Sequence, residues 1–96
     1  MVIMMSGLDY SLAPIELREQ LSFTKAQVGA LAERIRSEVE GVLGCVLLST
    51  CNRTELYLSC EKGRELQPGE VLCAAVGLSY APFARAFVTR RGSDAA

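Results

Sequence analysis

The sequence has 96 residues, of which 50% are hydrophobic and 22% are charged, with a formal net charge of -1 and no histidine or tryptophan. This length indicates one domain, and the apolar fraction excludes an intrinsically disordered chain. Without histidine these residues can form neither a Cys-His nor a Ser-His dyad, and the balanced charge argues against a surface specialised for nucleic-acid phosphates.

The first part of the chain predicts one strand and two helices. Residues 2–8 form an apolar run that ends in a turn, which favours a buried strand. Residues 14–22 predict a short amphipathic helix, because proline fits a first helical turn. Thr24 and Gln27 have the spacing of a capping box, which predicts a second helix of about four turns ending near Gly41. The apolar side of the first helix consists of Ile15, Leu17 and Leu21.

Two further runs predict an antiparallel hairpin. Residues 43–49 are mostly apolar, and residues 54–60 alternate between apolar and polar side chains. The second run places Leu56, Leu58 and Cys60 on one face. The connection of about four residues between the runs has a length typical of a hairpin and includes Cys51.

The last part predicts a loop over 61–69, a helix over 70–76, a final strand over 83–89 and a tail over 93–96. The resulting order of strand, helix, strand, strand, helix, strand indicates the α+β class. Within that class it indicates the ferredoxin-like split βαβ (βαββαβ) arrangement, an antiparallel sheet with helices on one face. Such a fold does not by itself indicate chemistry.

The four cysteines are predicted to have different environments. Cys45, Cys51, Cys60 and Cys73 show no C-x-x-C spacing, which together with the missing histidine argues against a metal site. The sequence has neither a secretion signal at its start nor a run of roughly 20 apolar residues, so we expect a cytoplasmic protein with free thiols and no membrane segment. Three cysteines lie in apolar runs and are predicted to be core residues, whereas Cys51 lies among polar residues and is predicted to be exposed.

The polar bend around Cys51 is the strongest candidate for a reactive site. A free cysteine is intrinsically nucleophilic, and Arg53 could either stabilise its thiolate or bind a substrate carboxylate through paired N–H bonds. The alternative is that Ser49, Thr50 and Asn52 only provide the hydrogen bonds of a turn and that the cysteine has no chemical role. The residues alone leave both interpretations open.

Two segments resemble a known family. Ser49-Thr50-Cys51-Asn52-Arg53-Thr54-Glu55 resembles the signature of glutamyl-tRNA reductase, and the segment from Gly7 to Glu19 is similar to that family's opening strand, turn and first helix. The resemblance covers nearly the whole chain. It implies that residues 1–96 are a single domain, the family's N-terminal catalytic domain, without the NADPH-binding and dimerisation domains.

The resemblance implies an enzyme, glutamyl-tRNA reductase, which begins tetrapyrrole (5-aminolevulinate) biosynthesis. Cys51 would attack the ester carbonyl of glutamyl-tRNA to form a thioester, and NADPH, bound by a domain absent from this chain, would reduce it to glutamate-1-semialdehyde. The match places Thr50, Asn52 and Arg53 at the substrate glutamate, with the arginine as the carboxylate clamp. The implied partners are glutamyl-tRNA, a glutamate-1-semialdehyde aminomutase, and a second copy that associates through the missing region.

The sequence differs from the family pattern at a few points. Tyr10 stands where the family often has histidine, Leu12 where threonine is usual, and the family's downstream histidine would lie beyond Ala96. No G-x-G-x-x-G phosphate loop occurs, so we do not expect these residues to complete the reduction alone. We favour an excised domain; the alternatives are a truncated inactive relative, a non-enzymatic ferredoxin-like module that binds a ligand or partner, and a redox-responsive domain with Cys51 as its sensor.

Overall fold

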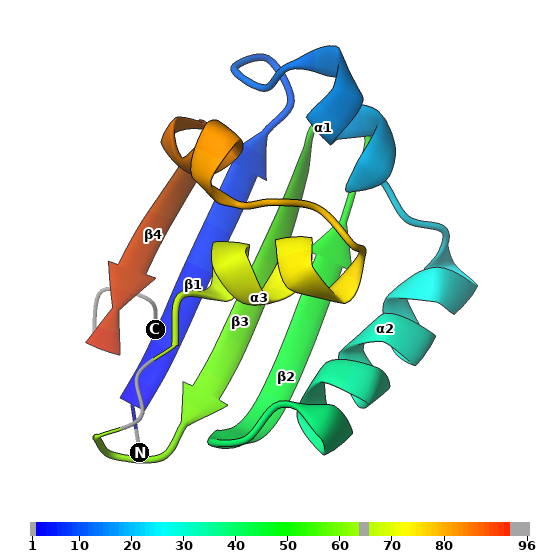
Figure 1. Cartoon of the computed structure of the whole chain (residues 1–96). Helices are drawn as coiled ribbons and strands as arrows, with labels where there is room; N and C mark the ends of the chain where they lie inside the picture. Colours follow the sequence, from blue (N-terminus) through cyan, green and yellow to red (C-terminus); the bar gives the residue numbers. More distant parts are fainter. Residues whose placement is uncertain (1, 64–65, 93–96) are drawn as a thin grey trace.

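The computed structural model describes residues 2–63 and 66–92, which form a four-stranded sheet with helices (Figure 1). In chain order the elements are strand β1 (Val2–Asp9), helices α1 (Ile15–Gln20) and α2 (Lys25–Glu38), strands β2 (Val42–Ser49) and β3 (Arg53–Cys60), helix α3 (Pro68–Ala75), a 3₁₀ helix η1 (Ala81–Ala86) and strand β4 (Phe87–Arg91). Part of the predicted loop over 61–69 and the predicted tail over 93–96 lie outside the described residues. None of the described helices is long and apolar enough to cross a membrane.

The strands lie in the order β2-β3-β1-β4, and each pairing is antiparallel. The predicted α+β class with an antiparallel sheet is therefore confirmed. Because side chains alternate between the two faces of a strand, β1 and β3 each send every second residue into the core. These buried residues are Met4, Ser6 and Leu8 in β1 and Thr54, Leu56, Leu58 and Cys60 in β3. Helices α2 and α3 cover this face of the sheet (Figure 1).

Helix α2 begins at the predicted capping box. The Gln27 backbone N–H donates to the Thr24 hydroxyl at 3.2 Å, and the Thr24 N–H donates to the Gln27 side-chain oxygen at 2.8 Å. These bonds satisfy N–H groups that the first turn of a helix leaves unpaired. Leu31 and Ile35 are one turn apart and both buried, and the helix ends before Gly41, whose φ of 92° suits glycine. Local sequence therefore determines both ends of α2.

Helix α1 lies at the end of the sheet where β2 ends and β3 begins (Figure 1). Leu17 in this short helix and Leu21, the residue that directly follows it, are four residues apart and completely buried. The prediction that Ile15 lies on the same side as these two residues is wrong, because its side chain is 58% exposed. Residues two apart in a helix point in different directions, so Ile15 cannot face the core together with Leu17.

Helix α3 begins at Pro68, two residues before the predicted start at residue 70. Proline suits this position because its fixed φ is helical and its missing N–H is not needed in the first turn. A Cβ added at Gly69 would lie 3.0 Å from ring carbons of Tyr80 and Phe87. Glycine therefore allows α3 to approach β4 closely.

The predicted final strand over 83–89 is wrong in its first half, where the chain forms η1, and β4 begins only at Phe87. Pro82 lies in the first turn of η1, where its fixed φ favours a helical turn. The ring centroids of Tyr80 and Phe87 are 5.6 Å apart, and Phe87 is buried. The strand therefore begins where a large aromatic side chain reaches the core.

Candidate active site

The candidate site is the turn between β2 and β3, residues 50–52, which we name the Cys51 turn. The Thr50 N–H donates to the Arg53 carbonyl at 2.9 Å, and the Thr50 hydroxyl accepts hydrogen bonds from the N–H groups of Asn52 and Arg53, each at 3.2 Å. A threonine hydroxyl that bonds nearby backbone amides stabilises a turn in this way. The Thr50 hydroxyl is thus engaged within the turn, and Thr50, Cys51 and Asn52 are all exposed.

The Cys51 turn lies beside the end of β1. The Tyr10 N–H donates to the Asn52 carbonyl at 3.1 Å, and the pairing of β1 with β3 places Asp9 opposite Arg53. The segment from Gly7 to Glu19 and the segment from Ser49 to Glu55, which both resemble the same family, therefore meet at one end of the sheet. Helix α1 lies at this end as well (Figure 1).

Three of the four cysteines have the predicted exposure, but Cys45, which was predicted to be a core residue, is only partly buried. Cys51 is exposed, Cys60 and Cys73 are buried, and Cys45 is partly buried. Burial disfavours a charged thiolate, so it raises the pKa of Cys45 to about 11 and also raises the pKa of Cys73. The thiolate is the reactive form of a cysteine, and burial both disfavours the thiolate and blocks access to it. Cys51 is the exposed cysteine, so it is the one that a bulky electrophile can reach.

We expect iodoacetamide to label Cys51 of the folded protein well before the other cysteines at about pH 8. Labelling of Cys45 should become fast only as the pH approaches about 11, where its partly buried thiol loses its proton. Mass spectrometry of labelled peptides across a pH series measures this order. The urea-unfolded chain is the control, in which all four cysteines should react at similar rates. Equal labelling of Cys45 and Cys51 in the folded protein would contradict the expectation.

Arg53 has acidic neighbours. Its Nη1 lies 3.7 Å from Oε2 of Glu55, and its side chain is 56% exposed. The pKa of Asp9 lies below its ordinary value, chiefly because the Ser11 hydroxyl and N–H donate to it at 2.7 and 2.9 Å, and to a smaller extent because of the charge of Arg53. The Glu55 side chain is only 19% exposed, so it is the Arg53 side of this pair that the carboxylate of a ligand can approach from solvent.

These neighbours of Arg53 were not predicted from the sequence. Arg53 and Glu55 are two residues apart in a strand and therefore share a face, a signal that could have revealed their pairing. Asp9 offers no such signal, because its position opposite Arg53 depends on the register between β1 and β3. The same holds for Tyr10, whose contact with the Cys51 turn joins distant parts of the chain.

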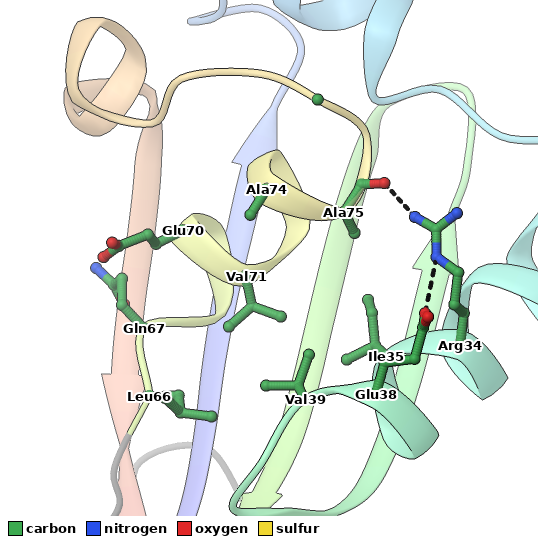
Figure 2. A pocket seen from close by; sticks show the side chains of 11 residues that line it. Arg34, Ile35, Glu38, Val39, Leu66, Gln67, Glu70, Val71, Ala74 and Ala75 are labelled. Carbon is green, nitrogen blue, oxygen red and sulfur yellow. Dashed lines mark hydrogen bonds and ion pairs between the residues drawn. The ribbon is translucent and has the colours of Figure 1, made fainter.

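Away from the Cys51 turn, a groove of about 1020 Å³ lies between α2 and α3 (Figure 2). Arg34 on its rim pairs with Glu38 at 3.5 Å and donates to the Ala75 carbonyl. The residues predicted to act at the site do not line this groove. Among the described residues, no group of three or more cysteine, aspartate or glutamate side chains could hold a metal ion. The candidate active site is therefore the exposed turn.

Comparison with known proteins matches residues 6–96 to the family described as "Glutamyl-tRNAGlu reductase, N-terminal domain". The glutamyl-tRNA reductases of Acetivibrio thermocellus and Alkaliphilus oremlandii are 46% and 43% identical to the chain over 94 residues, which are 98% of this chain and 28% of each relative. The glutamyl-tRNA reductase of Moorella thermoacetica is 44% identical over 65% of this chain and 14% of its own length. The chain thus spans 28% of the length of the first two relatives. With the two resembling segments meeting at one turn, these matches show that the chain belongs to the glutamyl-tRNA reductase family.

Proposed function

We propose that Cys51 is the nucleophile in the first half of glutamyl-tRNA reduction, the opening reaction of tetrapyrrole biosynthesis. After the thiol proton passes to solvent, the sulfur attacks the carbonyl carbon of the ester that joins glutamate to the terminal ribose of tRNA. A C–S bond forms, the C–O bond breaks, and the ribose oxygen takes up a proton as tRNA leaves. The product is a thioester between glutamate and Cys51. The observation that carries this proposal is the exposure of Cys51 at a turn, where a large substrate can approach.

The composition of the chain is compatible with this step. An aminoacyl ester is an activated acyl group, and a thiolate is a strong nucleophile, so the step does not require an imidazole base. The lack of histidine in the chain is therefore no obstacle to thioester formation.

We assign Arg53 to the side-chain carboxylate of the substrate glutamate. A guanidinium group can bind a carboxylate through two parallel N–H bonds, which a lysine cannot do. The Arg53 side chain, which is 56% exposed and 3.7 Å from Glu55, supports this role because a substrate carboxylate can reach it from solvent. In the same proposal Thr50 shapes the turn through its hydroxyl, and the exposed amide of Asn52 contacts the glutamyl group.

The hydride donor that the family implies is NADPH, and the described residues do not fit it. Dinucleotides typically bind where a glycine-rich turn joins a strand of a parallel sheet to a helix, whereas the pairings of this sheet are antiparallel. We therefore assign only thioester formation to this chain. We propose that NADPH binds in a part of the whole enzyme that this chain, which spans 28% of its relative, does not include.

Further features of the proposal concern the fold and the setting of the whole enzyme. The sheet order β2-β3-β1-β4, together with the order of the elements, supports a ferredoxin-like split βαβ arrangement. A reactive free thiol suits the reducing cytoplasm. Dimerisation and an aminomutase partner stay predictions for the whole enzyme, because this chain spans only 28% of the length of its relative.

The experiment that tests this function mixes the chain with tRNA charged with radiolabelled glutamate. We expect label on the protein in a bond that survives acid and is cleaved by neutral hydroxylamine, as a thioester is. tRNA charged with glutamine is the control, because its neutral amide cannot form an ion pair with Arg53. A protein that acquires no label from glutamyl-tRNA would overturn the proposed function.

A further inference from the structure

A buried chain of hydroxyl groups supports the base of the Cys51 turn. Thr54 is 1% exposed, and its hydroxyl donates to the Leu21 carbonyl at 2.6 Å. The Tyr10 hydroxyl lies 2.5 Å from the Thr54 hydroxyl. The Tyr10 hydroxyl also lies 3.3 Å from the Leu21 carbonyl, so either hydroxyl can be the donor in the bond between Tyr10 and Thr54. One continuous chain of hydrogen bonds thus runs from the end of β1, through β3, to the end of α1.

The residue opposite Thr54 in the hairpin adds a second link. Ser49 pairs with Thr54 at the end of the β2–β3 ladder, and their hydroxyl oxygens are 3.5 Å apart. The Phe23 N–H donates to the Ser49 hydroxyl at 3.2 Å. Both residues that close the hairpin before the Cys51 turn are therefore attached to the segment that joins α1 to α2.

We propose that Thr54 is a positioning residue for Cys51, an inference that rests on the proposed function of that cysteine. The Cys51 turn is exposed, so the direction of its thiol depends on how the ends of β2 and β3 are held. The Thr54 hydroxyl fixes the β3 end to Leu21, and the Tyr10 N–H holds Asn52 from the β1 side. Thioester formation needs the sulfur at the ester carbonyl while Arg53 holds the substrate carboxylate, and a displacement of about 1 Å can cost about 100-fold in rate.

A purely structural role predicts something different, and a second hydroxyl pair in the sheet provides the comparison. The Ser6 and Thr89 hydroxyls lie 2.7 Å apart, and Ser6 is 2% exposed. Thr89 belongs to β4, at the opposite edge of the sheet from β2. Replacing Thr89 with valine removes one hydroxyl from a sheltered pair, as replacing Thr54 does, but leaves the attachment of the Cys51 turn unchanged.

The test compares Thr54→Val, Thr54→Ser and Thr89→Val with the unmodified chain. Each protein is mixed with a concentration series of labelled glutamyl-tRNA, and the single-turnover rate of thioester formation, the rate of Cys51 alkylation and the thermal unfolding midpoint are measured. Thr54→Val should lower the maximal rate about 10-fold while changing the half-saturating concentration by less than about 2-fold. Thr54→Ser, which keeps the hydroxyl, should restore the rate. Thr89→Val should lower the unfolding midpoint but keep the rate.

The proposal is overturned if Thr54→Val reacts at the unmodified rate, if Thr89→Val loses as much rate, or if Thr54→Ser fails to restore it. Should the unmodified chain form no thioester, the proposed function fails, and Cys51 alkylation alone decides the positioning role. The positioning role is then supported if Cys51 is alkylated at a changed rate in Thr54→Val but not in Thr89→Val. It is overturned if Cys51 is alkylated at the same rate in Thr54→Val and in the unmodified chain. If Thr54→Val does not fold, Tyr10→Phe takes its place, because it removes the hydroxyl that bonds Thr54 and the Leu21 carbonyl.

Discussion

Replacing Cys51 with serine is expected to reduce thioester formation from glutamyl-tRNA below detection, a loss of about 1000-fold or more. The variant keeps nearly the same shape at an exposed turn, so folding should be unaffected. A serine hydroxyl is essentially un-ionised near neutral pH and needs a general base, whereas a thiol is already partly ionised. The chain has no histidine to act as that base. The measurement is protein-bound glutamate that hydroxylamine releases.

Cys45→Ser is the matched control for Cys51→Ser. Cys45 lies in β2, the strand that leads into the Cys51 turn, and its thiol is partly buried with a pKa raised to about 11. Cys45→Ser should therefore form the thioester at nearly the unmodified rate. Cys60→Ser and Cys73→Ser place a hydroxyl in the core and should affect stability more than thioester formation. An equal loss of thioester in all four variants would exclude Cys51 as the nucleophile.

Replacing Arg53 with alanine should raise the half-saturating concentration of glutamyl-tRNA by about 10- to 100-fold, since hydrogen bonds to a charged group contribute about 1.5–3 kcal/mol. Arg53→Lys keeps the charge but loses the paired geometry, so its affinity should lie between those of the alanine variant and the unmodified chain. Glu55, which pairs with Arg53 in the free protein, cannot bind the substrate carboxylate in its place, because both groups are negatively charged. The rate of thioester formation over a series of glutamyl-tRNA concentrations measures the effect.

Arg90→Ala provides the control for Arg53. Arg90 is also exposed and also lies in a strand, but it belongs to β4 and pairs with Met5. Its replacement removes the same charge from the protein and should leave the half-saturating concentration within about 2-fold of the original. If both alanine variants weaken binding equally, Arg53 acts only through general charge. If Arg53→Ala still prefers glutamyl-tRNA over glutaminyl-tRNA as strongly as before, it is not the carboxylate clamp.

Elements with a complete local signal were predicted correctly, whereas elements with an ambiguous local signal were given wrong bounds. The capping box of Thr24 and Gln27 uses hydrogen bonds between residues three apart, and the alternation in β3 reflects burial of one face. Both signals are complete within a short stretch of sequence. At Pro68 and at η1 the local pattern is ambiguous, because proline suits a loop as well as a first helical turn. There packing around Phe87 decides where α3 and β4 begin.

The sequence by itself determined that Cys51 lies in a polar turn between two strands, with Arg53 close behind it, because the hydrogen bonds of that turn join residues at most three positions apart. Only the tertiary structure decided what surrounds the turn. It placed Asp9 opposite Arg53 and connected Thr54 to the Leu21 carbonyl, 33 residues away in the sequence. Alternating burial fixes which face of the sheet each residue of β1 and β3 occupies. It does not fix which residue of β1 stands opposite which residue of β3, or how α1 packs at the end of the sheet.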